Sequence, residues 1–136
     1  MPENIKLEVV TPERFVVSEE AQIVVAPGVQ GEFGVLSGHT PFLSALKLGT
    51  IRYKDAQGVE RAVFVSGGFA EVLPDKVTVL AESAERRRDI DVERAKVALD
   101  RAQKRLAEAK EDRDFVRARA ALERAMQRLR VASSRQ

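Results

Sequence analysis

The chain contains no cysteine and no tryptophan, and only one histidine and one tyrosine. Without cysteine it cannot form disulfides, Cys-ligated zinc sites, iron–sulfur clusters or a thiol nucleophile, and a reducing compartment is its natural setting. A single histidine, His39, also excludes a His-rich metal site. We therefore expect no bound metal.

Long apolar runs are absent as well. No stretch approaches the ~20 consecutive apolar residues that a membrane-spanning helix needs. The first ten residues alternate charged and apolar side chains, unlike a signal peptide. We expect a cytosolic or peripheral protein. Its 136 residues suit one domain, or a small domain with an appendage, because domains most often hold ~100–150 residues.

Glycine and proline are missing from the C-terminal part of the chain. All eight glycines, all five prolines and the tyrosine precede Ala84. The charge changes at the same place: residues 1–84 hold seven Lys/Arg and eleven Asp/Glu, net −4, and residues 85–136 hold sixteen and ten, net +6. The sequence therefore predicts two domains, divided after residue 84.

Residues 1–84 are predicted to form a compact all-β sandwich. Short segments rich in β-branched residues often alternate apolar and polar side chains, and turn signals such as Pro27-Gly28 and Asp55-Ala56-Gln57-Gly58 lie between them. The predicted strands span residues 5–9, 22–25, 49–53, 61–65, 69–73 and 76–80. Between two of them, Gly67-Gly68 marks a bulge or a close approach of the backbone.

Residues 85–136 are predicted to form two amphipathic helices. Two series of apolar residues step by three and four positions, with a polar break over residues 110–114 between them. The series are Ala95, Leu99, Ala102, Leu106 and Ala109, then Phe115, Ala118, Leu122, Ala125, Leu129 and Ala132. So short a break predicts an antiparallel hairpin, with Asp89 and Asp114 as candidate N-caps.

Alanine makes up about half of the predicted seam between the helices. An alanine stripe buries little area, so the hairpin is expected to be only marginally favoured over an opened form. This makes the hairpin a candidate switch. The alternative, a passive decoration of the sandwich, remains open on periodicity alone.

The glycine-rich segment from Gly31 to His39 does not predict an active site. It lacks the Gly-Lys-Ser/Thr ending of a phosphate-binding loop, and no helix follows it. Glu32, Ser37 and His39 offer an acid, a nucleophile and a base, but residues this close on an extended segment need not converge, and no oxyanion hole is visible. We predict no catalytic residue in this chain.

The basic second domain leaves open an adaptor or a nucleic-acid-binding module. Nucleic acid is disfavoured, because the arginines alternate with ten acids and Phe115 has no aromatic companion for stacking. Arg124 and Arg128 stand out, since like charges one helical turn apart repel unless an anion bridges them.

Three segments, in this order, resemble the epsilon subunit of the bacterial and chloroplast F-type ATP synthase: GEFGVLSGHTP from Gly31, VSGGFAEV from Val65 and VTVLA from Val77. The resemblance runs nearly end to end. It implies an α+β fold, with an N-terminal sandwich of about ten strands and a C-terminal two-helix hairpin. It also implies a non-catalytic subunit of a rotary motor, in which the sandwich couples proton flow to ATP synthesis and the helices restrain ATP hydrolysis.

The resemblance further implies partners and a rotor interface. Glu32 matches the family glutamate that faces the c-ring loops, and His39 matches the histidine in the region that meets the gamma subunit. The alpha and beta subunits are implied partners when the helices extend along gamma. Nucleic acid is not an implied partner. Membrane contact is implied only through the Fo sector, at the cytoplasmic face of the cell membrane.

A narrower resemblance concerns Ile90 to Ala95, which is similar to the Ile/Leu-Asp-x-x-Arg-Ala motif of Bacillus-type epsilon subunits that bind ATP. It implies ATP as a regulatory ligand and leaves open whether Mg²⁺ accompanies it. The implied ATP-binding residues are Glu85, Ile90, Asp91, Arg94, Ala95, Arg124 and Arg128. The arginines would clamp phosphate oxygens. The alternative for Asp91 and Arg94 is a simple i,i+3 ion pair at a helix start.

Overall fold

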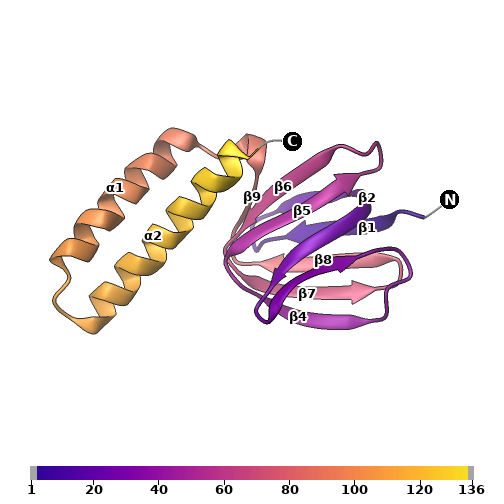
Figure 1. The fold of residues 1–136 in the computed structure, drawn as a ribbon, viewed down its shortest axis with the longest axis horizontal. Coiled ribbons are helices and arrows are strands. Elements are labelled where there is room, and N and C mark those ends of the chain that lie inside the picture. The colour runs from indigo at the N-terminus through magenta and orange to yellow at the C-terminus, as the bar shows by residue number, and fades with distance from the viewer. Residues whose placement is uncertain (1–2, 135–136) are drawn as a thin grey trace. The chain divides into compact units, whose positions relative to one another are not determined.

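The computed structural model describes residues 3–134 and divides the chain into two compact units (Figure 1). The first unit extends through Arg87 and the second begins at Arg88. This boundary lies three residues beyond the one expected at residue 84, because the short strand β9 (Ala84–Arg86) pairs with the sandwich.

The first unit is a β-sandwich of nine strands, against the ten or so that the resemblance implied. The others are β1 (Ile5–Val10), β2 (Phe15–Gly28), β3 (Gly31–Val35), β4 (Phe42–Leu46), β5 (Gly49–Asp55), β6 (Glu60–Val65), β7 (Gly68–Leu73) and β8 (Lys76–Ala81). All six predicted strands are present. Three strands, β3, β4 and β9, were not predicted.

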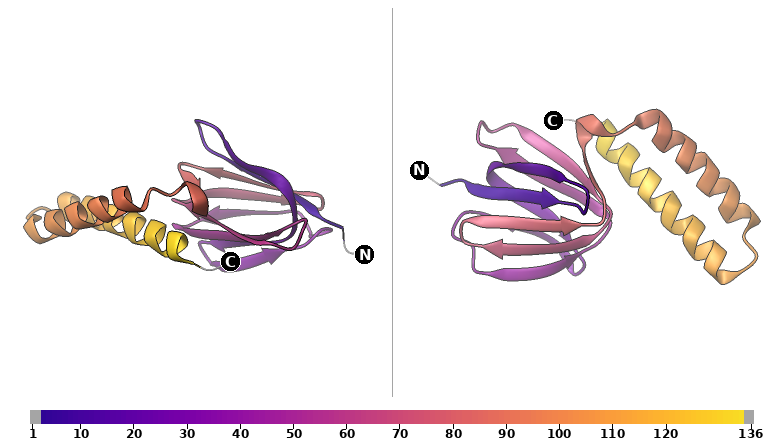
Figure 2. Two further views of the ribbon diagram at one scale, coloured as in Figure 1. Left: turned by 90° about the horizontal axis from the view of Figure 1, so that it is seen from above. Right: turned by 180° about the vertical axis from the view of Figure 1, so that it is seen from behind.

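Strand β2 joins the two layers of the sandwich. Its first half pairs with β1 and its second half with β3 and β5, so one long strand belongs to both layers. The order along the sheet is β1-β8-β7-β4-β2-β5-β6-β9, with β3 beside β2. Only β1 and β8 run parallel; the other pairings are antiparallel. Figure 2 shows the layers from two further directions.

Alternating side chains fill the space between the layers. Ile5, Leu7 and Val9 of β1 are fully buried, while the residues between them are half-buried on the other face. Val77 and Val79 repeat this pattern on β8. Each buried aliphatic side chain of this size stabilises the fold by ~1.5–3 kcal/mol. The sandwich therefore has an extensive core of its own.

Gly67 and Gly68 connect β6 to β7 and confirm the expected close backbone approach. Both have positive φ, 118° and 138°. A Cβ on Gly68 would overlap the carbonyl oxygen of Leu80 on β8. No larger residue fits there without moving β8.

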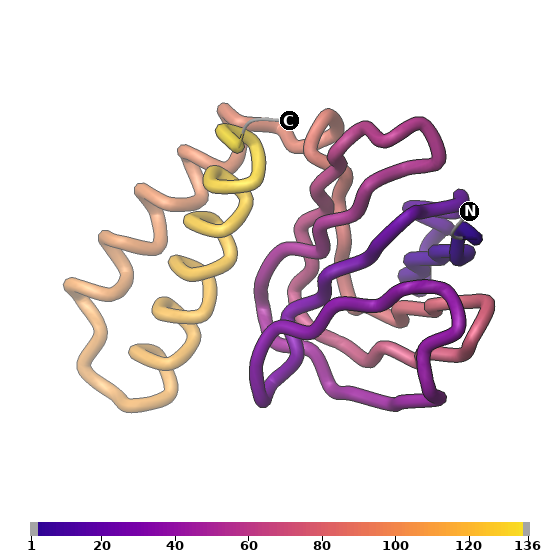
Figure 3. The backbone as a smooth tube through the Cα atoms, turned by 45° about the vertical axis from the view of Figure 1, so that its right-hand side comes forward, coloured from indigo at the N-terminus to yellow at the C-terminus, as the bar shows by residue number. Residues whose placement is uncertain are grey.

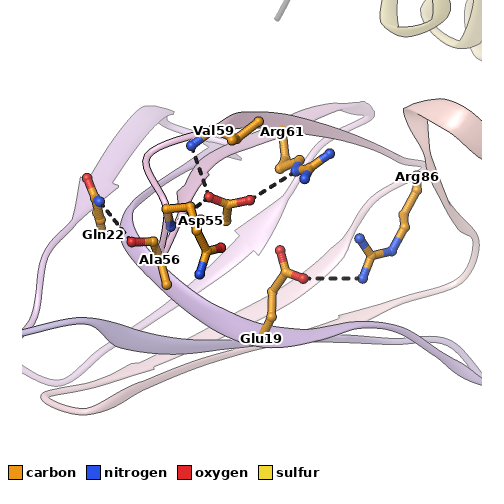
Figure 4. Close-up of polar contacts among 8 residues, drawn as sticks. Glu19, Gln22, Asp55, Ala56, Val59, Arg61 and Arg86 are labelled. Carbon is orange, nitrogen blue, oxygen red and sulfur yellow. Dashed lines mark hydrogen bonds and ion pairs between the residues drawn. The ribbon is translucent and has the colours of Figure 1, made fainter.

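Asp55 closes the turn between β5 and β6 (Figure 4). Its carboxylate accepts hydrogen bonds from the backbone N–H groups of Val59 and Gln57, at 2.9 and 3.0 Å, and pairs with Arg61 at 3.2 Å. The bond from Val59 is the main cause that lowers the pKa of Asp55, and Arg61 adds to it. The carboxylate thus stabilises the turn above its ordinary pKa and loses this effect as the pH falls through its lowered value.

Arg86 fastens β9 to β2, as Figure 4 also shows. Its Nε donates a hydrogen bond to the carbonyl oxygen of Val16 at 2.9 Å, and its guanidinium lies 3.7 Å from the carboxylate of Glu19. The Glu19 carboxylate that pairs with Arg86 also acts on Tyr53: burial, together with this carboxylate, raises the pKa of the Tyr53 hydroxyl. The end of the sandwich is therefore held by side chains as well as by the short β9 ladder.

The second unit is an antiparallel helical hairpin of α1 (Val92–Glu108) and α2 (Asp112–Ser133), visible in Figure 3. A short 3₁₀ helix, η1 (Arg87–Asp89), precedes it. Both expected N-caps were wrong: Asp89 lies in η1, and Asp114 lies inside the first turn of α2, whose cap position is Glu111. Over residues 3–134, no helix is both long enough and apolar enough to cross a membrane.

Replacing Gly68 by alanine is expected to destabilise the sandwich by roughly 3 kcal/mol or more, because a Cβ meets backbone and φ is positive. Gly34 is the matched control, since the space around its Cβ position is open and its φ is not positive. Gly34→Ala should change stability by less than about 1 kcal/mol. Urea unfolding measures both, and equal losses would contradict the backbone argument.

Candidate functional site

The segment similar to the ATP-binding motif forms the start of α1. Asp91 is the N-cap residue: its Oδ1 accepts a hydrogen bond from the backbone N–H of Arg94 at 3.0 Å. An Asp at this position satisfies a free helix N–H and lies near the positive end of the helix dipole. The Asp-x-x-Arg spacing is therefore a helix cap in its own right.

Ile90 and Ala95 flank this cap. They occupy the positions before the N-cap and in the first turn where a hydrophobic staple forms, and they are 8% and 4% exposed. Helix initiation thus accounts for three motif residues, Ile90, Asp91 and Ala95. The side chain of Arg94 is exposed, and no ion pair joins it to Asp91 in the described residues, so the expected alternative of an i,i+3 pair is not observed.

The seam between the helices is built on four buried alanines. Ala95 and Ala102 of α1 and Ala118 and Ala125 of α2 are each at most 4% exposed, whereas the seam leucines are half-buried and Phe115 is exposed. Ala102 lies six residues before the last residue of α1, and Ala118 lies six residues after the first residue of α2. Ala95 lies thirteen residues before the last residue of α1, and Ala125 lies thirteen residues after the first residue of α2. The alanines therefore face each other as two rungs, ~10 Å apart along the hairpin.

An arginine precedes each of these alanines. Because successive helical residues are rotated by ~100°, Arg94 and Arg124 lie to one side of the Ala95–Ala125 rung. The two helices are antiparallel, so equal rotations bring both side chains to the same face of the hairpin. Arginines also precede the seam residues Leu106 and Leu129. The arginine face consists of Arg94, Arg101, Arg105, Arg117, Arg124 and Arg128.

The opposite face of the hairpin carries the ion pairs. Lys96 pairs with Glu93 at 3.6 Å, Lys104 with Asp100 at 3.2 Å, and Arg119 with Glu123 at 3.3 Å. Each of these residues either comes directly after a seam alanine in the sequence or lies on the side of its helix that is turned away from the seam. These three ion pairs therefore lie away from the arginine face.

The structure brings the implied ATP-binding arginines to one end of the arginine face. Arg94 and Arg124 belong to the same rung, and Arg128 lies one turn further along α2. Glu85 lies on β9, in the sandwich unit. It is the one implied ATP-binding residue outside the hairpin.

The two implied rotor residues lie on different elements. Glu32 is on strand β3, where a loop was expected, and its carboxylate pairs with Arg52 of β5 at 2.9 Å. His39 lies between β3 and β4; its Nδ1 is 2.6 Å from the carbonyl oxygen of Thr40, and its ring is 6.3 Å from that of Phe42. Each side chain makes only local surface contacts of a common kind. In the described residues, no ion pair or hydrogen bond joins Glu32 to His39.

An apolar row on the outer face of the sandwich was not predicted. Strand register aligns Phe15 with Val10, Val10 with Leu80, Leu80 with Phe69, and Phe69 with Ala45 across β2, β1, β8, β7 and β4. Its large members Phe15, Phe69 and Leu80 are 64%, 56% and 58% exposed. Pairing register, which the sequence does not state, is what brings these residues together.

No group of three or more His, Asp or Glu side chains able to hold a metal occurs within residues 3–134.

Comparison with known proteins identifies family matches over residues 4–133. The family model described as ATP synthase, Delta/Epsilon chain, beta-sandwich domain matches residues 4–87. The model described as ATP synthase, Delta/Epsilon chain, long alpha-helix domain matches residues 88–133.

Individual relatives agree with these matches. The ATP synthase epsilon chain of Desulforapulum autotrophicum is 70% identical over 107 residues, 79% of each chain. That of Desulfatibacillum aliphaticivorans is 69% identical over 106 residues, 78% of this chain and 75% of the other. Among solved structures, a chain of the Euglena gracilis mitochondrial ATP synthase (OSCP/F1/c-ring) aligns with a TM-score of 0.79 at 25% identity, covering 93% of this chain and 80% of that one.

Proposed function

Since this chain belongs to the ATP synthase delta/epsilon chain family, as an epsilon subunit of the central stalk rather than the catalytic subunit, we propose that its sandwich docks on the rotor while its hairpin restrains ATP hydrolysis under the control of ATP. Matches to both family domains leave no support for a non-motor adaptor or nucleic-acid-binding module. The subunit would itself be non-catalytic and peripheral to the cytoplasmic face of the cell membrane, touching the membrane only through the Fo sector.

The apolar row supports docking on the gamma subunit. Three large exposed apolar side chains aligned across neighbouring strands are unusual for a surface that stays in water. The row ends on β4, the strand that follows His39, which the family resemblance assigns to the region meeting gamma. Glu32, on β3, would serve the contact with the c-ring.

Phe69→Glu is expected to weaken binding of the full chain to gamma by about 30-fold, as for a central interface residue. Val59→Glu is the matched control, because Val59 is an apolar side chain 40% exposed in the β5–β6 turn, away from the row. Affinity measurements on immobilised gamma compare the two. Equal affinities for both variants, each folded by circular dichroism, would show that the row is not the docking surface.

The arginines of α2 support restraint of hydrolysis. The position of the arginines carries this part of the proposal: Arg117, Arg124 and Arg128 follow one side of α2 as a stripe, and Arg117 and Arg124 are exposed. Such a stripe would be attracted to an acidic surface, which the resemblance places in the C-terminal domain of the beta subunits. Exposed charges are screened within ~8 Å at physiological salt, so the restraint would weaken as salt rises.

Replacing Arg117, which lies outside the proposed ATP site, by glutamine is expected to raise ATP hydrolysis by the assembled enzyme up to about fivefold, since an exposed charge contributes ~0.2–1 kcal/mol. The control replaces Arg119 and Arg130, which lie on the other face and bond to Glu123 and Gln127. The assay uses an enzyme whose wild-type hydrolysis rises when the tail is removed. Equal relief by both variants would contradict a face-specific contact.

ATP would act as a conformational ligand. Arg94 comes from α1, and Arg124 and Arg128 come from α2, so one phosphate chain can reach all three only while the helices are folded together. An alanine seam makes the folded hairpin marginal. ATP at 100 times its dissociation constant would stabilise the folded form by ~2.7 kcal/mol, which tilts such an equilibrium.

Arg124→Gln is expected to weaken ATP binding to the full chain at least about tenfold, while Arg119→Gln, on the other face, should change it less than about twofold. Asp91→Asn separates capping from ligand binding, because asparagine caps helices about as well as aspartate. Calorimetry gives the affinities, and a spin-label pair across the helices reports folding. If ATP binds without drawing the helices together, the regulatory proposal is wrong.

A further inference from the structure

The two helices of the hairpin repeat one another. Residues 91–106 read DVERAKVALDRAQKRL, and residues 114–129 read DFVRARAALERAMQRL. Nine of the 16 aligned positions are identical at a constant offset of 23, including every arginine of the arginine face. The Asp-x-x-Arg-Ala pattern therefore occurs twice, once on each helix.

Antiparallel pairing converts this repeat into an approximate two-fold symmetry. Ala95 of α1 corresponds to Ala118 of α2, and Ala102 corresponds to Ala125. In the hairpin, however, Ala95 lies level with Ala125 and Ala102 with Ala118. An axis between the two rungs therefore exchanges the helices and exchanges the rungs.

The same operation gives each arginine of the proposed ATP site a counterpart at the other rung. Arg94 corresponds to Arg117, Arg124 to Arg101, and Arg128 to Arg105. One set takes a single arginine from α1 and two from α2; the other set takes two from α1 and one from α2. Both sets lie on the arginine face, ~10 Å apart.

The counterpart set is exposed, with the Asp114 and Glu108 carboxylates each three residues away from one of its arginines. Arg101, Arg105 and Arg117 are exposed, and none forms an ion pair in the part of the chain that the structure describes. Arg101 and Arg105 are one turn apart, where like charges repel. An ordinary solvated helix would mix its signs on both faces, as the ion-paired face of this hairpin does. Three arginines that helix geometry places beside one rung suit an anion with several oxygens.

We propose that Arg101, Arg105 and Arg117 form a second site for a phosphate-bearing anion, related by the internal symmetry to the site at Arg94, Arg124 and Arg128. The assignment of ATP to the first site rests on the proposed function, but the second site rests on the repeat and the charge pattern. It lies nearer the loop that connects α1 to α2.

The second site should be the weaker of the two. In the first set, the Asp91 carboxylate is engaged in capping α1. Its counterpart, Asp114, lies inside the first turn of α2 and is exposed, so its negative charge faces water near the second set and opposes anion binding. Arg113 does not offset this charge fully, since it pairs with Glu111 at 3.0 Å.

A titration of the full chain with inorganic tripolyphosphate, followed by the NMR signals of the arginine Nε–H groups, tests the proposal. Arg101, Arg105 and Arg117 should shift along a saturable curve, at higher concentration than Arg94 and Arg124. Arg119, on the ion-paired face, should barely shift. Repeating the titration with ATP shows whether the nucleoside matters.

Calorimetry on variants supplies the second measurement. Wild type should bind two tripolyphosphate ions per chain. Arg117→Gln should weaken the weaker site at least about tenfold and spare the tighter one, whereas Arg124→Gln should do the reverse. Arg119→Gln should leave both sites intact. All are exposed positions, so circular dichroism should remain unchanged.

Three results would overturn the second site. The first is that Arg101 and Arg117 stay unshifted at concentrations that saturate Arg94 and Arg124. The second is that all arginines, including Arg119, shift together without saturation. The third is that Arg117→Gln leaves two equal sites. Failure of the proposed function is distinct, because it would show as the absence of an ATP response at Arg94 and Arg124.

Discussion

The helical unit depends on how two helices meet through alanine. Four buried alanines allow a close approach but remove little apolar area from water, so the hairpin gains much less from burial than the sandwich does from its valines, leucines and isoleucines. A weakly held hairpin is one that a bound ion or a partner can shift. An arginine precedes each of these alanines, so the seam lies beside the arginine face of the hairpin.

Much of the fold could be predicted from the sequence. Alternation identified six strands, and the change of period near Ala84 identified the helical unit. Strand β3 was missed because its two glycines suggested a loop; pairing with β2 makes it a strand. Strand β9 was missed because three residues carry no period of their own. The caps were misplaced because Asp89, Asp91 and Asp114 are all suitable residues, and only the course of the backbone selects Asp91.

The candidate sites show a similar division. The motif at Ile90 to Ala95 could be found from the sequence, but its structural role as a helix cap and staple could not. The apolar row depends on register across five strands, which no single segment encodes. The arginine face combines rotation along each helix with the antiparallel direction of the pair. Its internal repeat was present in the sequence, yet it acquires meaning only when the helices are placed side by side.

Strand β9 also protects the sandwich from other chains. It covers the edge of β6, whose Val63, Phe64 and Val65 are completely buried. A chain that ended before Ala84 would leave this apolar strand with unpaired N–H and C=O groups, a surface that recruits strands from other molecules and promotes aggregation. We therefore expect the three residues of β9, held in place by Arg86, to protect this edge of the sandwich from pairing with other chains.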